Sequence, residues 1–394
     1  MSKQIDDNDI VITSAFRTPI RSFLGSLSDH SAVQLGTEVI KKCIEHSKLE
    51  NSDVDMVYMG QVLQTGSGQN PARQSLINSG IENSKSATTI NQVCGSGLAA
   101  VALGYNSLKL NDANIIIAGG QESMTNSPHY QVLRKNEKNE ESKMKDSMLI
   151  DGLIDVYNQY HMGVTAENVA EKYQITRKEQ DEFAVNSQSK ASAAIKLNKF
   201  KNEIVPIKLK NGKMFDTDEY PKIGTNIEKL STLKTVFKEN GTVTAGNASG
   251  LNDGAAALTL MTLKTAKDKN LKPLAKIVSW ATCGVEPALM GTGPIPATNK
   301  ALKKAGWSIN DLDLIESNEA FASQSIAVIK ELKIPIEKVN VNGGAIALGH
   351  PIGASGARIL VTLVHEMIRR DLKKGLTTLC IGCCIGISMC VESD

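Results

Sequence analysis

Two stretches far apart in the chain repeat one pattern, and this repeat constrains the fold more than any other feature. Residues 91–123, "NQVCGSGLAAVALGYNSLKLNDANIIIAGGQES", and residues 349–384, "GHPIGASGARILVTLVHEMIRRDLKKGLTTLCIGCC", each begin with a turn of small residues, continue at helical spacing and end in an apolar strand. The apolar residues on one helix face are Leu98, Val101, Ala102, Tyr105 and Leu108 in the first stretch, and Leu360, Leu363, Val364, Met367 and Ile368 in the second. A duplicated α/β half explains the repeat, but any two helix–strand units share such a pattern, so the residues alone leave both interpretations open.

Apolar runs alternate with helix-like segments toward both ends of the chain. Residues 9–16 and 54–63 are predicted strands, and residues 32–49 between them carry apolar side chains at helical spacing. Such alternation predicts an α/β fold, in which helices flank a sheet. At 394 residues the chain exceeds the usual size of one core, which favours two domains or a duplicated one. The polar, Lys- and Glu-rich segment 123–246 is predicted to be an insertion that covers a site.

The charge and the cysteine content argue against several classes of protein. A net charge of +2 without segregation of sign argues against nucleic acid and a membrane surface as partners. The chain contains no run of about 18 apolar residues to span a bilayer, and its first residues resemble no targeting leader. Seven cysteines, an odd number without disulfide spacing, indicate free thiols in a reducing compartment. We therefore expect a soluble cytoplasmic protein.

Cys94 lies in "NQVCGSGL", directly before a predicted helix. The N-terminus of a helix presents unpaired N–H groups and the positive end of the helix dipole, and both favour a thiolate. Such a position lowers the pKa of a cysteine from its ordinary value of about 8.5 and makes the thiol a nucleophile. The alternative is a small buried cysteine that behaves as an apolar residue, which is the commoner case.

Three further places carry groups that can act in catalysis or binding. His350 lies in a glycine-rich stretch, "GGAIALGHPIGASGAR", where a tight loop can approach a ligand, although a capping or packing histidine fits equally well. Asn318 and Glu319 follow a predicted strand, where such residues commonly form turns. Residues 241–258 form a loop of small residues that can hold a pantetheine or a phosphate. Each of these signals is weak alone.

Cys380 and Cys383 form a C-x-x-C pair near the C-terminus. A zinc site requires a second close pair, and the other cysteines supply none. A dithiol redox pair lies at the start of a helix after a strand, whereas the segments flanking this pair are predicted to be the two strands of a hairpin. The sequence therefore disfavours both a metal and a redox role for the pair.

Taken together, these motifs resemble the thiolase family, in the family's order and over nearly the whole chain. The matching stretches are "RTPIRSFLGSL" (17–27), "GQNPARQ" (68–74), "NQVCGSGL" (91–98), "YHMGVTAEN" (160–168), "VTAGNASGLNDGAA" (243–256), "MGTGPIPA" (290–297), "SNEAF" (317–321), "NGGAIALGHPIGASGAR" (342–358) and "LCIG" (379–382). The resemblance implies a five-layered α-β-α-β-α fold of two duplicated βαβαβαββ halves with an inserted α/β loop domain. The implied domains are residues 1–122 with 247–273, the insertion 123–246 over the CoA site, and residues 274–394.

The resemblance also implies catalytic roles at matching positions. Cys94 would be the nucleophile that takes the acyl group from a CoA thioester, and His350 would accept the proton of the attacking thiol. Cys380 would remove the α-proton of the incoming acetyl-CoA. His350 and a water held by Asn318 would form one oxyanion site, and the backbone N–H groups of Cys94 and Gly382 the other. Carbon–carbon bond formation requires this division, because it needs both a covalently held acyl group and a base beside it.

The segment "DGLIDVYNQYHMGVTAEN" (151–168) is similar to that of short-chain thiolases. The implied reaction is the reversible condensation of two acetyl-CoA to acetoacetyl-CoA and CoA. CoA thioesters are the implied substrates, no permanently bound cofactor or metal is expected, and the family implies a homo-oligomer, either a dimer or a tetramer. Matching positions for binding CoA and the acyl group are His161, Met162, Lys222, Phe237, Ala245, Ser249, Met290 and Phe321.

Three alternatives remain open. A broad-chain 3-ketoacyl-CoA thiolase of fatty-acid breakdown differs in the length of its substrate. A decarboxylating ketosynthase does not need the proton abstraction implied for Cys380. A thiolase-like binding protein without turnover fits less well, since Cys94, His350, Asn318 and Cys380 are all present.

Cys383 and Cys384 stand where the family usually has two glycines. If either position requires a positive φ, a residue other than glycine costs roughly 1–3 kcal/mol of local strain. Gly382, which the implied oxyanion site uses, is retained. We expect catalysis to survive, with a stiffer loop whose additional thiols make it prone to oxidation.

Overall fold

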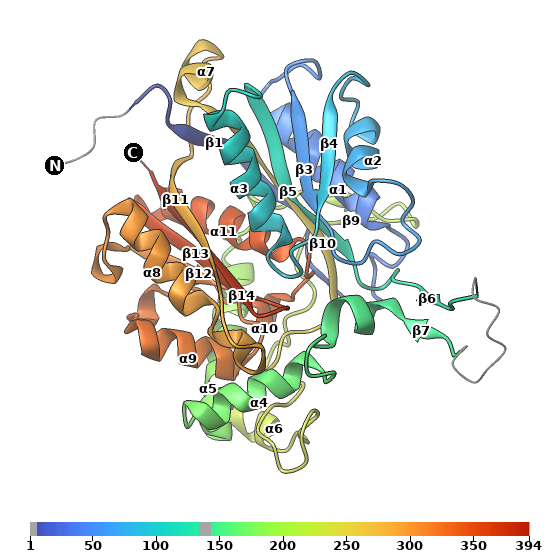
Figure 1. Ribbon diagram of the computed structural model, residues 1–394, viewed down its shortest axis with the longest axis vertical. Helices are drawn as coiled ribbons and strands as arrows, with labels where there is room; N and C mark the ends of the chain where they lie inside the picture. The colour runs from blue at the N-terminus through green and yellow to red at the C-terminus, as the bar shows by residue number, and fades with distance from the viewer. Residues whose placement is uncertain (1–5, 134–142, 394) are drawn as a thin grey trace.

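The computed structural model describes residues 6–133 and 143–393. Residues 134–142, part of the predicted Lys- and Glu-rich insertion, lie outside the described residues. Ten strands of the described chain form one mixed sheet with helices on both faces. Figure 1 shows the N-terminal half, in blue, beside the C-terminal half, in red. The predicted α/β class is therefore confirmed.

The first half alternates strands and helices and ends in two strands. Its elements are β1 (Ile10–Arg17), α1 (Ala32–His46), β3 (Met56–Gly60), α2 (Pro71–Asn78), β4 (Ser86–Ile90), α3 (Ser96–Lys109), β5 (Ile115–Ser123) and, after the insertion, β10 (Asn252–Thr262). The strands lie in the order β1-β10-β5-β3-β4. β10 is antiparallel to both neighbours, while β5, β3 and β4 are parallel. This is the βαβαβαββ order that the resemblance implies.

The second half repeats that arrangement. Its main elements are β11 (Ala275–Gly284), α8 (Pro294–Ala305), β12 (Leu314–Ser317), α9 (Ala322–Leu332), α11 (Ser355–Arg370), β13 (Lys374–Ile381) and β14 (Ile385–Glu392). The strands lie in the order β11-β14-β13-β12, again antiparallel around the last strand and parallel beyond it. The counterpart of β4 is reduced to one parallel bridge between Ile315 and Val339. The equal order of the strands confirms the predicted duplication.

The helices form three layers that alternate with the two halves of the sheet. α3 and α11 lie between the halves, and their apolar side chains pack in one cluster with strands of both. α1 and α2 cover the outer face of the first half, and α8 and α9 cover that of the second. Because α11 has a sheet on either side, it is buried almost all round. The five-layered fold is therefore present.

Two details of the structure differ from the pattern of the sequence. Ile368 is 47% exposed, because it lies in the last turn of α11, where the neighbouring Arg369 and Arg370 also reach solvent. The predicted strand 54–63 ends at Gly60. The N–H groups of Val62 and Leu63 donate to the carboxylate of Glu122 at 3.0 and 3.2 Å, and not to a neighbouring strand. Buried N–H groups need a partner, and here a side chain supplies it.

The remaining elements are short apart from two helices. Within the insertion they are β6 (His129–Tyr130), β7 (Lys145–Asp146), η1 (Leu149–Leu153), α4 (Met162–Lys172), α5 (Arg177–Lys196), β8 (Ile207–Lys208), β9 (Met214–Phe215) and α6 (Ile227–Ser231). Elsewhere they are β2 (Arg21–Ser22), α7 (Leu263–Asp268), η2 (Pro287–Thr292), η3 (Ile309–Asp311), η4 (Ile336–Lys338) and α10 (Ala345–Leu348). α4, α5 and α6 gather at one end of the sheet, at the bottom of Figure 1.

Arg17, at the end of β1, ties the insertion to the sheet. Its guanidinium donates to Glu203 at 2.5 Å and to both carboxylate oxygens of Asp218 at 2.7 and 2.8 Å. All three side chains are buried. Asp218 also accepts the N–H of Ile20 at 2.8 Å, and Glu203 accepts the hydroxyl of Thr362 at 3.0 Å. The buried charges are thus paired and hydrogen-bonded, as their burial requires.

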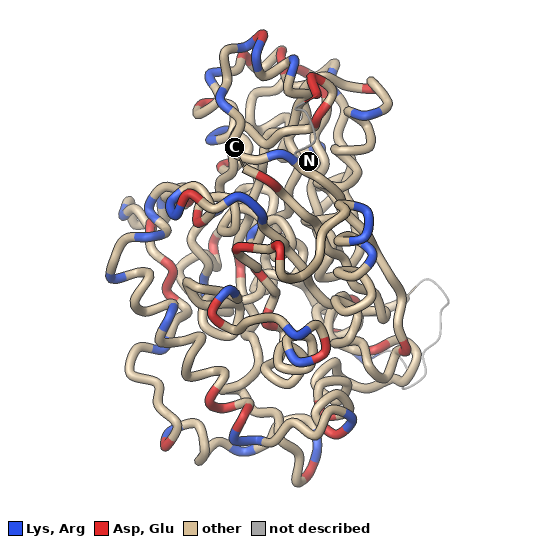
Figure 2. The backbone as a smooth tube through the Cα atoms, turned by 90° about the vertical axis from the view of Figure 1, so that its left-hand side faces the viewer, with Lys and Arg blue, Asp and Glu red and all other residues tan. Residues whose placement is uncertain are grey.

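Charged residues of both signs are interspersed along the backbone in Figure 2. Within residues 6–133 and 143–393, the structure has no helix with the length and apolar character needed to cross a bilayer. This distribution gives the visible side of the molecule no region of a single charge.

The turn between β13 and β14 holds two cysteines in a left-handed conformation. φ is 62° at Cys383 and 64° at Cys384. For a residue with a Cβ, this conformation costs about 1–2 kcal/mol relative to the right-handed one. Both cysteines therefore have the positive φ at which we expect local strain, and glycine is the residue that this turn favours. The two strands of the predicted hairpin are also confirmed.

Replacing Arg17 with alanine should lower the free energy of unfolding by about 3–5 kcal/mol, because two buried carboxylates lose their partner. Denaturant unfolding followed by circular dichroism measures this change. Lys210→Ala is the matched control, since Lys210 pairs with Asp29 on the surface at 2.6 Å, and its loss should stay within about 0.5 kcal/mol. A loss below about 1 kcal/mol for Arg17→Ala would contradict the role of Arg17 as a tether.

Replacing both Cys383 and Cys384 with glycine should raise the free energy of unfolding by about 1 kcal/mol, because relief of left-handed strain outweighs the entropy that glycine adds to the unfolded chain. The control is Cys283→Gly, in strand β11, where φ is not positive. That variant should lose about 0.5–1 kcal/mol. A double variant less stable than the parent would show that the turn is not strained.

Candidate active site

Cys94 lies in a tight turn between β4 and α3. Val93, the residue before it, has a left-handed φ of 46°, which is rare for a β-branched side chain. Ser96 holds the turn: its hydroxyl donates to the carbonyl of Val93 at 2.6 Å and accepts the N–H of Gln92 at 2.9 Å. The chain therefore changes direction at once from strand to helix, and Cys94 lies at a cavity.

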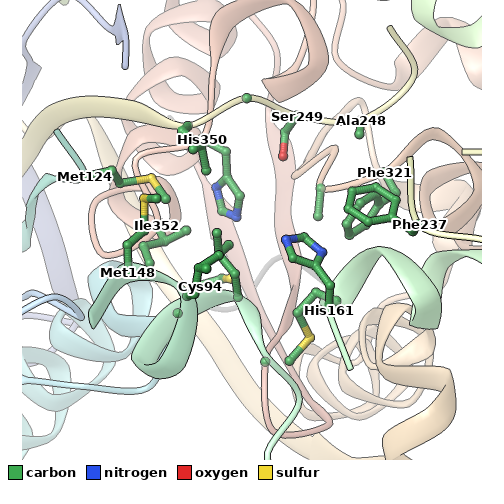
Figure 3. A pocket seen from close by; sticks show the side chains of 18 of the residues that line it. Cys94, Met124, Met148, His161, Phe237, Ala248, Ser249, Phe321, His350 and Ile352 are labelled. Carbon is green, nitrogen blue, oxygen red and sulfur yellow. The ribbon is translucent and has the colours of Figure 1, made fainter. Parts of the chain in front are cut away.

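This cavity of about 420 Å³ brings together most of the residues predicted from the sequence. Figure 3 shows His350 and Cys94 facing one another across it, with His161, Phe237 and Phe321 to one side. The predicted residues among its lining are Cys94, His350, Cys380, Gly382, His161, Met162, Phe237, Ala245, Ser249, Met290 and Phe321. They come from both halves of the chain and from the insertion, so the complete fold is needed to assemble them.

The thiol of Cys94 is more basic than the sequence predicts. Burial raises the pKa of Cys94 to about 11, and the charge of Glu122 adds to the rise. N–H groups of Gly382 and of Cys94 itself bond the sulfur and lower this pKa, but by less. The prediction of a lowered pKa is therefore wrong for the free protein, because loss of water penalises the thiolate more than two N–H groups stabilise it. The thiol is protonated at neutral pH and needs a base.

His350 is held by two short polar contacts and is uncharged. Its backbone N–H donates to Asn252 Oδ1 at 2.8 Å, and its Nδ1 lies 2.5 Å from Ser355 Oγ. Gly349 before it has φ 106°, and a Cβ there would lie 2.5 Å from Asn252, so only glycine fits. Burial, with a smaller effect of the charge of Arg358, lowers the pKa of His350 to about 3. The imidazole is thus neutral at physiological pH and can accept a proton.

Asn318 lies behind His350 and does not line the cavity. Its Nδ2 is 3.5 Å from His350 Nδ1, and its buried Oδ1 has no hydrogen-bond partner within the described chain. The backbone N–H of Asn318 donates to the carbonyl of Thr378 at 3.0 Å, which fixes it beside β13. A buried amide oxygen of this kind is suited to holding a water, as the implied role of Asn318 requires.

Glu319 anchors the segment that carries Asn318, a role that the sequence did not indicate. Its buried carboxylate accepts from Ser187 Oγ at 2.7 Å, Asn340 Nδ2 at 2.8 Å and the N–H of Ile346 at 3.1 Å. Burial raises the pKa of Glu319. One side chain thereby joins α5 of the insertion, the segment after β12 and the segment before His350.

Cys380 and Gly382 approach the turn of Cys94 from β13. Cys380 is buried, and burial raises its pKa well above the ordinary value, with a further rise from the charge of Cys94. A Cβ at Gly382 would lie 3.0 Å from the side chain of Val93. Glycine at this position therefore lets β13 come close enough for the N–H of Gly382 to bond the sulfur of Cys94.

Three rings that contact one another form one wall of the cavity. His161 precedes α4, and its Nδ1 accepts the N–H of Gly163 at 3.0 Å. The ring of His161 stacks on Phe237 with centroids 4.6 Å apart, and Phe237 meets Phe321 edge to face at 6.2 Å. A Cβ at Gly163 would lie 2.2 Å from Phe237, so the stack depends on that glycine. Burial lowers the pKa of His161, which keeps the stack uncharged.

Lys222 is the predicted binding residue that lies outside this cavity. Its ammonium lies 5.2 Å from the ring centroid of Tyr220, which does line the cavity. The sequence missed most of the apolar lining, namely Met124, Met148, Leu149, Leu153, Tyr220, Val236, Ala248, Leu251 and Ile352. Such residues carry no signal of their own, because the same types fill any protein core.

All seven cysteines are free thiols. Among the residues that the structure describes, no three His, Cys, Asp or Glu side chains form a group that can hold a metal ion. The C-x-x-C pair spans the end of β13 and the following turn, with Cys380 buried and Cys383 partly exposed. This placement differs from the helix start that a dithiol redox pair occupies.

The chain matches two protein-family models in succession. Residues 10–264 match the model described as Thiolase, N-terminal domain, and residues 271–393 match Thiolase, C-terminal domain. A curated acetyl-CoA acetyltransferase of Paracoccus denitrificans is 54% identical over 385 residues, which cover 97% of this chain and 98% of that protein. A protein of the same name from Rhizobium meliloti is 55% identical over 386 residues, with the same coverage.

Solved structures match the whole arrangement. A crystal structure of the Bacillus anthracis acetyl-CoA acetyltransferase has a TM-score of 0.96 at 42% identity. Human mitochondrial 3-ketoacyl-CoA thiolase has a TM-score of 0.95 at 41% identity. Each comparison covers 98% of this chain and 98% of the other. With both halves matched by the family models and curated relatives more than half identical over nearly the full length, this chain belongs to the thiolase family.

Proposed function

We propose that the protein is an acetyl-CoA C-acetyltransferase. It condenses two acetyl-CoA to acetoacetyl-CoA and CoA, reversibly, through an acetyl thioester on Cys94. The observation that carries this proposal is the meeting of Cys94, His350 and Cys380 at one cavity. The names of the curated relatives support it. The reaction as proposed uses protein groups and CoA thioesters alone.

The first half-reaction transfers an acetyl group to Cys94. His350 Nε2 accepts the thiol proton as the sulfur attacks the carbonyl carbon of acetyl-CoA. The N–H groups of Cys94 and Gly382, which bond the sulfur in the free protein, stabilise the tetrahedral oxyanion, each by about 3 kcal/mol. The carbon–sulfur bond to CoA then breaks, and the leaving sulfur takes the proton from His350.

The second half-reaction requires Cys380 as a thiolate. In the free protein, burial and the charge of Cys94 raise the pKa of Cys380. Cys380 first gives its proton to solvent, a step that burial opposes, and the acetylated Cys94 can no longer ionise beside it. Cys380 removes a methyl proton from the second acetyl-CoA, and the enolate, whose oxygen accepts from a water held by Asn318 beside His350, attacks the acetyl group. Cys94 leaves as a thiolate and takes the proton on Cys380, and Cys380 regains a proton from solvent, which restores the free protein.

The cavity favours a short acyl group. Its volume of about 420 Å³ lies toward the lower end of the range of about 300–1,000 Å³ for ligand sites. The packed rings of His161, Phe237 and Phe321 fill space at one wall of the cavity, and we expect them to block a longer acyl chain. The second candidate is a broad-chain 3-ketoacyl-CoA thiolase, which the likeness to a human mitochondrial protein of that name favours. The fold is common to both, so these side chains carry the distinction.

The remaining lining residues fit a passage for pantetheine. Ser249, whose hydroxyl points into the cavity in Figure 3, and Ala245 lie in the loop before β10. Met162 and Met290 add flexible apolar surface, which adapts to irregular ligands. Lys222, beside Tyr220, is assigned to the nucleotide end of CoA, where its charge would meet a phosphate.

Assembly, location and domain limits complete the proposal. β4 forms one edge of the sheet, and its residues are partly or fully exposed. Exposed strand edges favour pairing with another chain, which fits a homo-oligomer, either a dimer or a tetramer.

Seven free thiols suit the cytoplasm. The proposed domains are residues 1–122 with 247–273, the loop domain 123–246, and residues 274–394.

Brief incubation of the freshly reduced protein with acetyl-CoA should place one acetyl group on the peptide that contains Cys94. Mass spectrometry measures the modification, and added CoA should release it because the step is reversible. Cys94→Ala should remain unmodified, while Cys390→Ala, which alters a buried thiol in β14, should acetylate as the parent does. Absence of acetylation in the parent would favour a binding protein without turnover.

Acetoacetyl-CoA should be cleaved with a kcat/KM at least about 100-fold above that for 3-ketohexadecanoyl-CoA, since each methylene that does not fit costs about 1 kcal/mol or more. Phe237→Ala should narrow this ratio, because it removes the ring stacked on His161. Phe215→Ala, in β9 and outside the cavity lining, should leave the ratio unchanged. Similar kcat/KM values for both substrates in the parent would rule out the short-chain assignment.

A further inference from the structure

Ser355 makes the closest polar contact to the proposed base. It is the first residue of α11, is fully buried, and its Oγ lies 2.5 Å from His350 Nδ1. The same Oγ lies 2.9 Å from the carbonyl oxygen of Pro351. Ser355 Oγ therefore contacts two groups. The imidazole nitrogen can donate or accept a hydrogen bond, whereas the carbonyl oxygen of Pro351 can only accept one.

Counting protons distinguishes the two neutral forms of His350. If Nδ1 carries the proton, it donates to Ser355 Oγ, and the Ser355 hydroxyl donates to Pro351; both short contacts are then hydrogen bonds. If Nε2 carries the proton, the hydroxyl must turn to Nδ1, and the contact with Pro351 is lost. The first form has one more hydrogen bond, worth about 1 kcal/mol. Asn318, 3.5 Å from Nδ1, is too far to compete with Ser355.

We propose that Ser355 is a positioning residue of the acyl-transfer reaction: its oxygen accepts the Nδ1 proton of His350 and so leaves Nε2 unprotonated toward Cys94. The inference rests on the function proposed above, in which His350 takes the proton of Cys94. Only the form with an unprotonated Nε2 can do so, because the other form presents a donor to the thiol.

The partner of Nδ1 also determines how long the imidazole keeps the proton. While Cys94 attacks the thioester, both ring nitrogens of His350 carry protons, and Ser355 accepts from one of them. A hydroxyl is a neutral acceptor, unlike a carboxylate, so it orients the ring without strongly stabilising the positive charge. The charged Arg358, three residues further along α11, acts against the imidazolium as well. The proton on Nε2 is therefore readily released to the sulfur of departing CoA.

The ionisable groups near Ser355 and His350 determine the pH range in which the proposal can be tested. They are Arg358 on α11, Glu122 on β5, Cys380 on β13 and Cys94 itself. Burial raises the pKa of Glu122 to about 7, and its carboxylate accepts the N–H of Gly353, in the loop of His350, at 2.8 Å. Measurements from pH 7.5 to about 9.5 lie on the upper side of this titration and below the pKa of Cys94.

The test is the rate of a single acetylation of Cys94 by acetyl-CoA, followed by mass spectrometry over this pH range. The parent should show a rate that is independent of pH. Ser355→Ala should be about 10- to 100-fold slower at pH 7.5, the usual effect of removing the group that orients a functional histidine. Its rate should rise almost tenfold per pH unit, because solvent must then ionise the thiol. Ser355→Thr, which keeps a hydroxyl, should restore both the rate and the flat profile.

Ser75→Ala is the matched control. Ser75 is fully buried and lies four residues after a proline, and its hydroxyl approaches the carbonyl of Pro71 at 3.2 Å. It therefore shares with Ser355 its burial and its contact with a proline carbonyl. Its other contacts are with Gln121 and Val33 and not with a histidine, so its removal should leave the acetylation rate unchanged. A Ser355→Ala rate equal to the parent, or a slower rate that stays independent of pH, would overturn the proposal.

A measurement on the unchanged protein keeps the proposal testable if Ser355→Ala does not fold. Nitrogen-15 NMR of histidine-labelled parent at pH 7.5, with the signal assigned by its absence in His350→Asn, reports which ring nitrogen carries the proton. A proton on Nδ1 supports the proposal, and a proton on Nε2 overturns it. Failure of the parent to acetylate would instead refute the proposed function, because Ser355 is intact there.

Discussion

The contact between the first turns of α3 and α11 determines where the candidate catalytic groups meet. A Cβ at Gly97 would lie 2.8 Å from the backbone of Ala357, and one at Gly356 would lie 2.5 Å from the backbone of Leu98. Because both positions are glycine, the two backbones touch, and the turns that precede the helices come together. Cys94 precedes α3 and His350 precedes α11, so one packing contact between equivalent positions of the two halves places thiol and imidazole at the same cavity.

The same burial that assembles the pair also keeps it uncharged. Removing water raises the pKa of Cys94 to about 11 and lowers the pKa of His350 to about 3. In the free protein a thiolate–imidazolium pair is therefore unfavourable. In the proposed reaction, negative charge develops only when it can move onto the carbonyl oxygen of a bound thioester. In the proposed reaction the fixed N–H groups of Cys94 and Gly382 are most valuable at that point, because they would stabilise the oxyanion without reorganising. The neutral state of Cys94 and His350 and the strength of the two N–H donors therefore both follow from the removal of water from the site.

From the sequence the fold and the candidate catalytic residues could be predicted, but few of the residues that hold them in place. Helical and strand periodicity predicted the repeat, and reactive residue types beside glycine turns marked Cys94 and His350. By contrast, Ser355, Glu319 and Asn252 are ordinary polar residues whose importance comes from distances between segments far apart in the chain. No periodicity encodes such distances.

The prediction for the pKa of Cys94 failed for a related reason, since it considered the helix terminus and not the water removed around it. Local sequence patterns mark the groups that each half of the chain contributes. The environment of those groups is determined only once the whole chain has folded. The insertion illustrates this division: Phe237 is an apolar residue by sequence, yet against His161 and Gly163 it becomes a wall of the cavity. In the proposed mechanism the duplicated halves share the chemistry, and His161 and Phe237 of the insertion, with Phe321, limit the acyl group.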